Sequence, residues 1–167
     1  QWYIGTATHN SGTKSLYISN DNGVSNAYTN TSTVFVYAYQ ELTLDAGGYS
    51  ISYDWKAYGE SDYDYIRVFL APTSVTLPAG ASPNSSTTSA YTWSSQALPT
   101  GCIGLTGTNL KLNLQSSWQS FYTDFTVPTA GTYRLVFAWA NDASGGSKPP
   151  GAIVNIAITR PNCPRIT

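Results

Sequence analysis

The residues best suited to chemistry are four carboxylates that lie close together in the sequence. Asp62 and Asp64 flank Tyr63, and Asp54 and Glu60 lie nearby. A glycosidase needs two carboxyl groups that face each other across a sugar, one of them with a raised pKa. Asp62 belongs to a turn, and Asp54 is expected to pair with an arginine that holds it ionised. This group of carboxylates therefore offers no obvious general acid.

Other signatures of catalysis are missing from the sequence. The single histidine, His9, stands alone in a polar stretch, and the chain has no Gly-x-Ser-x-Gly nucleophile motif. It has no phosphate-binding loop and no metal-protease motif either. An active site needs a constellation of groups and not single residues. We therefore expect a binding domain that is not an enzyme and needs no cofactor.

The segment from Ile51 to Leu70 predicts two strands joined by a polar turn at Gly59–Asp62. Four-residue loops are common hairpin connections, and Gly and Asp suit a turn. Pairing the two strands outward from this turn places the following residues opposite each other: Tyr58 and Tyr63, Lys56 and Tyr65, and Asp54 and Arg67. An opposite-charge pair and an aromatic pair directly across a hairpin stabilise such a register.

The two faces of this hairpin differ, because successive side chains of a strand point to opposite sides. One face is apolar and is expected to join the core: Ile51, Tyr53, Trp55, Ile66, Val68 and Leu70. The other is polar and aromatic and is the candidate ligand-binding face: Asp54, Lys56, Tyr58, Tyr63, Tyr65 and Arg67. Its rings would stack on a ligand while its charged groups hydrogen-bond hydroxyls. The alternative is an ordinary solvated face whose charges only set the register.

Trp93 is a further ligand-binding candidate, within a long segment rich in Ser, Thr, Pro and Gly that runs from Ala71 to Gly101. Irregular segments of this length are uncommon in compact domains and are usually functional or disordered. An exposed tryptophan there would form a platform for a pyranose ring. Alternatively, Trp93 folds back against the edge of the core, since large aromatic side chains are mostly buried somewhere. The sequence leaves both interpretations open.

The composition is typical of an extracellular all-β domain. Charged residues make up only 10% of the 167 residues, whereas the chain has thirteen Tyr and five Trp. A net charge of −1 argues against nucleic acid as a partner, because nucleic-acid binding requires a basic surface. No apolar run is long enough to span a membrane. A chain that starts at Gln1 and contains no Met is expected to be a processed or excised piece of a longer protein, secreted or on the cell surface.

The order of predicted strands indicates an antiparallel sandwich of two sheets. Alternating aromatic and β-branched residues predict strands over Ser15–Ser19, Thr33–Leu44, Ile51–Tyr58, Tyr63–Leu70, Asn109–Leu114, Trp118–Val127, Thr132–Ala140 and Ala152–Thr159. Turn residues separate them, and no helical pattern with caps is present. We expect one all-β domain over residues 1–160, followed by a tail or linker over residues 161–167.

Two further features concern a disulfide and a metal. Cys102 and Cys163 either form a disulfide between the tail and a mid-chain loop or remain two thiols, because spacing does not fix connectivity. The run Asn20–Gly23 offers clustered oxygens of the kind that Ca2+ prefers, but a tight turn is the favoured interpretation.

The succession of motifs resembles a known family. The motifs are Ser15–Gly23, Tyr53–Gly59, Tyr63–Leu70, Trp118-Gln119, Tyr133–Asp142, Pro149-Pro150 and Ile153–Ile156. Together they resemble the jelly-roll domains of the MAM-like and cleaved-adhesin type, which are similar to carbohydrate-binding modules and occur in secreted and surface proteins of gut and oral bacteria. Such relatives usually carry an Asp in the last strand that can help to bind a structural Ca2+. Val154 stands at that position, so a Ca2+ site there is in doubt and a buried hydrophobic contact is the simpler interpretation.

This resemblance implies a two-sheet jelly roll without enzymatic activity. The leading hypothesis is a noncatalytic carbohydrate-binding or adhesive module of a secreted multidomain bacterial protein, with a polysaccharide or other glycan as its partner. The alternative is a protein-binding or structural spacer domain of a surface adhesin. That domain would contact a host or cell-surface protein through an edge strand or through the segment from Ala71 to Gly101.

Overall fold

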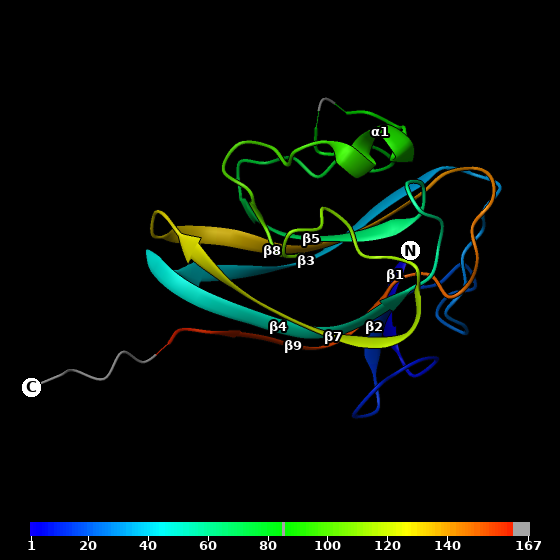
Figure 1. The fold of residues 1–167 in the computed structure, drawn as a ribbon, viewed down its shortest axis with the longest axis horizontal. Helices are drawn as coiled ribbons and strands as arrows, with labels where there is room; N and C mark the ends of the chain where they lie inside the picture. Colours follow the sequence, from blue (N-terminus) through cyan, green and yellow to red (C-terminus); the bar gives the residue numbers. More distant parts are fainter. Residues whose placement is uncertain (85, 162–167) are drawn as a thin grey trace, which may run out of the picture.

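The computed structural model describes residues 1–84 and 86–161, and it shows two antiparallel sheets packed face to face (Figure 1). The five-stranded sheet has the order β1 (Trp2–Gly5), β2 (Ser15–Ile18), β9 (Ala152–Thr159), β4 (Gly47–Ala57) and β7 (Gln115–Val127). The four-stranded sheet has the order β3 (Val34–Leu44), β8 (Gly131–Asn141), β5 (Tyr65–Pro72) and β6 (Ile103–Gly104). The predicted all-β sandwich is therefore confirmed.

The strand order is that of a jelly roll. Strands early in the chain pair with strands late in the chain: β2 with β9, β3 with β8, β4 with β7 and β5 with β6. The two halves of the chain thus run together as an antiparallel ribbon that folds over into two sheets. The jelly-roll topology that the family resemblance implied is confirmed.

The predicted hairpin between Ile51 and Leu70 is wrong. β4 pairs with β7 and β9, whereas β5 pairs with β8 and β6, so the two strands lie in opposite sheets. The chain crosses between the sheets at the turn after Gly59. The φ of Gly59 is 64°, in the left-handed region, and a Cβ at this position would collide with the Asp64 backbone. The apolar alternation of the two strands was identified correctly, but it fits a crossing between sheets as well as it fits a hairpin.

The predicted core face is confirmed. All six of its members are buried in the interior between the sheets: Ile51, Tyr53, Trp55, Ile66, Val68 and Leu70. The first three come from β4 in the five-stranded sheet and the other three from β5 in the four-stranded sheet, beside the inward residues of β8, so one continuous apolar layer joins both sheets. Burial of this layer is the main driving force for folding.

The outer face of the four-stranded sheet is covered by a second hydrophobic cluster. The segment that joins β5 to β6 folds down onto this sheet and contains the short helix α1 (Ala90–Ser95), which Ser89 caps by accepting a hydrogen bond from the Thr92 amide (Figure 1). The outer face of the five-stranded sheet carries no such cover in Figure 1. The long segment that was expected to be irregular is therefore a packed part of the structure.

Within the described residues, no helix combines the length and the apolar character that a membrane span requires.

Candidate functional site

Three of the predicted ligand-binding residues are buried where the segment between β5 and β6 (the helical segment) packs on the four-stranded sheet: Tyr65 and Arg67 on β5, and Trp93 on α1. Tyr65 and Trp93 are completely inaccessible to solvent, and Arg67 is 1% exposed. The Tyr65 hydroxyl donates a hydrogen bond to the Ala90 carbonyl (2.7 Å), and burial raises the pKa of Tyr65. Tyr65 and Trp93 belong to the second hydrophobic cluster, and Arg67 is buried beside Trp93, so none of the three is accessible to a ligand. For Trp93, this confirms the interpretation in which it folds back onto the core.

Arg67 was expected to form an ion pair with Asp54, and this prediction is wrong. The Arg67 guanidinium donates hydrogen bonds to the carbonyl oxygens of Trp93 (2.9 Å) and Gln96 (3.0 Å). It also lies 4.7 Å from the centre of the Trp93 ring, at a distance suited to a cation–π interaction. A buried charge needs such partners, because an unpaired one is strongly unfavourable. Arg67 therefore stabilises the packing of the helical segment on β5.

Asp54 lies on the outer face of the five-stranded sheet, where neighbouring strands and a loop hold it. Its carboxylate accepts hydrogen bonds from Ser120 Oγ (2.7 Å), Asn155 Nδ2 (2.7 Å) and Asn10 Nδ2 (3.0 Å). The Ser120 bond is the largest cause of a lowered pKa at Asp54, and the two Asn bonds act in the same direction. Asp54 is thus an ionised acceptor in a fixed orientation.

The remaining members of the predicted face are distributed over three places. Lys56 lies beside Asp54 on the outer face, with its Nζ 5.2 Å from the centre of the Trp118 ring. Tyr63 lies instead on the turn before β5, where it stacks on Tyr91 of α1 with ring centres 5.2 Å apart. Tyr58 follows β4 and is 41% exposed. The predicted face therefore does not exist as one surface: Asp54 and Lys56 remain together on the outer face, and Tyr65 and Arg67 remain together but buried against Trp93.

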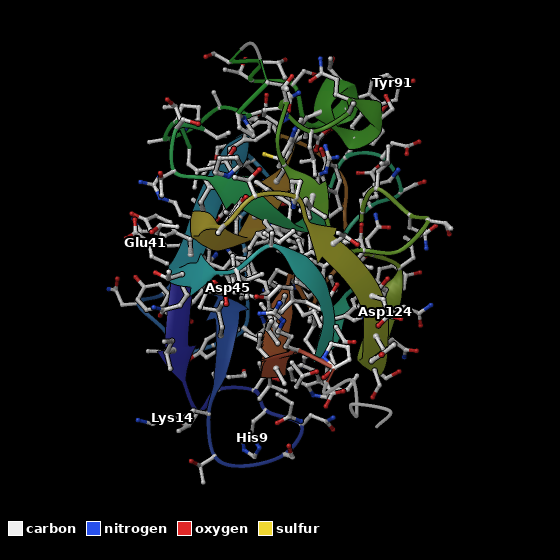
Figure 2. The ribbon with its side chains drawn as sticks, turned by 90° about the vertical axis from the view of Figure 1, so that its left-hand side faces the viewer. His9, Lys14, Glu41, Asp45, Tyr91 and Asp124 are labelled. Carbon is white, nitrogen blue, oxygen red and sulfur yellow. The ribbon has the colours of Figure 1, made fainter. Side chains whose placement is uncertain are left out.

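The outer face of β4 and β7 brings Asp54 and Lys56 together with aromatic and polar side chains of β7. We call this set the outer aromatic face: Ser50, Asp54, Lys56, Trp118, Ser120, Tyr122 and Asp124. Its positions alternate along each strand, and the register pairs Asp54 with Ser120 and Ser50 with Asp124. Asp124 lies at the edge of the sheet in Figure 2.

Tyr122 is the most exposed aromatic side chain of this face, at 64%. Its hydroxyl donates a hydrogen bond to Asp124 Oδ1 (2.8 Å), which also accepts one from Ser50 Oγ (2.6 Å). These bonds, with that from Ser50 as the larger cause, lower the pKa of Asp124. The ring is therefore held at one end while its face stays accessible.

Sequence reasoning missed Trp118, Ser120, Tyr122 and Asp124. Their alternation along the predicted strand Trp118–Val127 was visible and would have placed them on one face. The sequence did not reveal that this strand pairs with β4. Asp54 and Ser120, which lie opposite each other in the sheet, are 66 positions apart in the chain.

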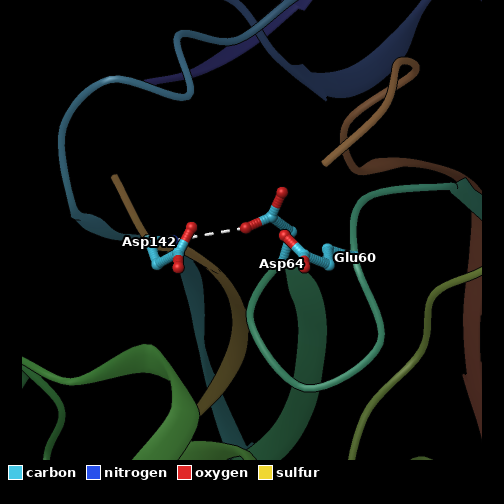
Figure 3. A group of neighbouring side chains, drawn as sticks. All are labelled: Glu60, Asp64 and Asp142. Carbon is cyan, nitrogen blue, oxygen red and sulfur yellow. Dashed lines mark hydrogen bonds between the residues drawn. The ribbon is translucent and has the colours of Figure 1, made fainter. Parts of the chain in front are cut away.

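Three carboxylates meet at the end of the sandwich near the crossing turn (Figure 3). Oxygens of Glu60, Asp64 and Asp142 all lie within 4.8 Å of one another. Asp64 is fully buried and accepts hydrogen bonds from the Tyr28 hydroxyl (2.5 Å) and from the Asp142 amide (3.2 Å). Burial raises the pKa of Asp64 to about 6, against the smaller opposite effect of the Tyr28 bond. Clustered carboxylates of this kind could hold a hard cation such as Ca2+.

The segment Asn20–Gly23, considered as a Ca2+ site, forms a turn in which its own neighbours hold the carboxylate. Asp21 accepts hydrogen bonds from the Ser19 and Ser25 hydroxyls, which lower its pKa to about 2. Val154 lies opposite Asp54 on β4 and is half-buried, so it is not the fully buried contact that was expected.

Cys102 is half-buried beside the second hydrophobic cluster, and burial raises the pKa of its thiol to about 11. Its predicted disulfide partner, Cys163, lies outside the described residues, so the bridge stays a prediction.

Comparison with known proteins adds no family to this description: no family model matches the chain, and neither does any curated protein.

Proposed function

We propose that this protein is a noncatalytic carbohydrate-binding or adhesive module of a secreted or cell-surface protein, and that the outer aromatic face is its binding surface. The observation that carries the proposal is the exposed ring of Tyr122, held by Asp124 on the outer face of β7. An aromatic ring fixed in this way stacks on the apolar face of a sugar and loses little side-chain entropy on binding.

The polar groups of the face suit a ligand rich in hydroxyl groups. Asp54 and Asp124 are ionised acceptors whose orientation is set by hydrogen bonds. Lys56 is a donor that lies over the Trp118 ring. Charge-assisted hydrogen bonds from fixed groups are stronger than those between neutral partners. The face therefore combines stacking surfaces with acceptors and a donor, as recognition of a polysaccharide requires.

The same pKa values support a noncatalytic role. A glycosidase needs an exposed carboxyl group that stays protonated near neutral pH. The lowered pKa values of Asp54 and Asp124 keep these two groups ionised, so neither can act as the acid. Asp64 has the required raised pKa, but it is fully buried and cannot reach a sugar.

The test is a glycan array together with pull-downs on insoluble polysaccharides. Tyr122→Ala and Trp118→Ala are expected to abolish the signal that the native protein gives. Tyr91→Ala is the matched control, because Tyr91 is also an exposed aromatic residue (56%) but lies on α1, away from the outer aromatic face. Absence of any signal from the native protein, or equal loss in all three variants, would refute the proposal.

The alternative function, a protein-binding or spacer domain, is supported by β9, which pairs with β2 only at Ala152 and Ile153 and leaves its later residues without a strand on that side among the described residues. The segment between β5 and β6 is a weaker candidate for such contacts, because it supplies Trp93 and Ala90 to the second hydrophobic cluster. Deleting this segment would expose that cluster and so could not distinguish binding from folding.

A further inference from the structure

One side of the sandwich is closed along only half of its length. At the closed end, β2 pairs with β9 at Ile153 and Ala152, and β1 continues the sheet beyond β2. Trp2 of β1 then reaches across to the other sheet, where its Nε1 donates a hydrogen bond to the Val36 carbonyl (3.2 Å). The two short strands thus seal the interior at this end.

Beyond β2, the same side of β9 has no strand beside it. Residues Asn155–Thr159 belong to β9, which pairs with β4 on one side as far as Thr159, but its pairing with β2 ends at Ile153. In the opposite sheet, β3 pairs with β8 over its whole length and with no other strand among the described residues. Ser11 of the loop between β1 and β2 hydrogen-bonds to the Asn155 side chain. From Ile156 to Thr159, the side of β9 that faces away from β4 has no strand partner among the described residues, and this open strip in line with β2 is called the lane.

The floor of this lane is apolar. A groove of about 410 Å³ opens between the two edges and is lined by Gln40, Leu42, Leu135, Phe137, Ile156 and Ile158. Leu135 and Phe137 belong to the core between the sheets, and Ile156 is 40% exposed. Five of the six lining residues are apolar, so the groove suits aliphatic side chains better than sugars or ions.

Beyond Asn155, this edge lacks the chemical protection that natural edges commonly have. Edge strands in natural proteins are protected by charged residues, proline, a β-bulge or a covering segment. β9 has such an irregularity at Asn155, where φ is 56° and the register with β4 shifts, but the residues that follow, Ile-Ala-Ile-Thr, contain neither a charge nor a proline. This end of the edge, above an apolar groove, is suited to the addition of a strand.

We propose that this lane binds an extended segment of a partner polypeptide, which pairs antiparallel with β9 in line with β2. The free main-chain groups of β9 require a partner with regularly spaced N–H and C=O groups, and only an extended polypeptide supplies them at strand spacing. Alternate side chains of the added strand point into the groove, so the partner carries aliphatic residues at every second position. This surface is separate from the outer aromatic face, and the inference does not depend on glycan binding.

The experiment uses a fluorescein-labelled peptide, Lys-Thr-Val-Thr-Val-Thr-Lys, and the same peptide with its second Val replaced by Pro. Anisotropy titration is expected to show binding of the first peptide and at least tenfold weaker binding of the second, because Pro removes a main-chain donor. Hydrogen exchange of the amides of residues 155–159 is expected to slow in the presence of the first peptide only. Ile156→Asp should lose binding, whereas Ala157→Asp, the adjacent position on the opposite face of β9, should keep it.

Equal binding of the two peptides to the native protein would overturn the proposal, and this arm does not depend on whether a variant folds. Full binding to Ile156→Asp would also overturn it. Two further measurements test other occupants. If sedimentation shows a dimer that Ile156→Asp converts to a monomer, the lane is assigned to a second copy. If the anisotropy titration shows tighter peptide binding after removal of residues 162–167, the lane is assigned to the C-terminal residues of the chain. Either result would overturn the assignment to a partner polypeptide.

Discussion

The guanidinium of Arg67 lies 4.7 Å from the centre of the Trp93 ring, and both side chains are buried. The two residues were expected to bind a ligand, and they bind each other. Their contact joins β5 to the helical segment, and Arg67 adds hydrogen bonds to the carbonyls of Trp93 and Gln96. The pair therefore stabilises the fold and keeps the outer face of the four-stranded sheet closed to ligands.

Replacing Arg67 is expected to destabilise the protein strongly. Arg67→Ala removes the cation–π contact and leaves the buried Trp93 carbonyl and the partly buried Gln96 carbonyl without their donors, at a cost of roughly 3 kcal/mol in the free energy of unfolding. Urea denaturation followed by tryptophan fluorescence measures this change. Arg134→Ala is the matched control, because its ion pair with Glu41 is partly exposed and such pairs contribute less than about 1 kcal/mol. Similar stabilities of the two variants would contradict the structural role of Arg67.

The role of the Tyr122 ring can be separated from that of its hydroxyl. Tyr122→Phe keeps the stacking surface and removes the hydrogen bond to Asp124, so it is expected to retain most glycan affinity. Tyr122→Ala removes the ring, and a loss of about tenfold in affinity or more is expected, equivalent to roughly 1.4 kcal/mol. Calorimetric titration with a polysaccharide selected from the array measures both. Equal losses in the two variants would show that the hydroxyl, and not stacking, holds the ligand.

The stability of the protein is expected to fall as the pH rises through the titration of Asp64. Its pKa is about 6 in the folded protein and 3.8 when unperturbed, so between these values the folded state binds more protons than the unfolded state. The full contribution is present below the unperturbed pKa and is lost as the pH rises through about 6, with a total of roughly 3 kcal/mol. Thermal unfolding measured across this range should show the fall, and Asp64→Asn should remove it.

The Asp64 measurement is made in the presence of a chelator. A cation held by Glu60, Asp64 and Asp142 would favour the ionised carboxylates and mask the pH dependence. A native protein whose stability rises steadily with pH from 4 to 7 in chelator would contradict the raised pKa of Asp64.

The loop that covers the three carboxylates is expected to be intolerant of a side chain at Gly146. Its φ is 74°, and a Cβ there would collide with Asp64 Oδ2 and with the Tyr28 hydroxyl. Gly146→Ala should therefore cost more than the roughly 1–2 kcal/mol that the left-handed conformation alone costs a residue with a Cβ. Gly12→Ala is the control, since Gly12 has a φ of 69° but no neighbour near the added Cβ. Denaturation midpoints of the two variants provide the comparison, and equal shifts would exclude the steric contribution.

The fold class and the core-facing sides of β4 and β5 could be predicted from the sequence alone. Alternation along β4 and β5 identified Tyr53 and Trp55, and Ile66 and Val68, as core residues, because side-chain direction in a strand follows from position alone. The same alternation placed Asp54 and Lys56 on an outer face.

Which strands are neighbours could not be predicted from the sequence and is known only from the tertiary structure. The period of two is the same whether β4 pairs with the next strand along the chain or with β7, so the sequence could not reject the pairing of Asp54 with Arg67. It also could not show that a distant helical segment covers Tyr65 and Arg67, or that Trp118 and Tyr122 come to lie beside Asp54 and Lys56. These relationships depend on contacts between residues far apart in the chain, which local patterns do not encode.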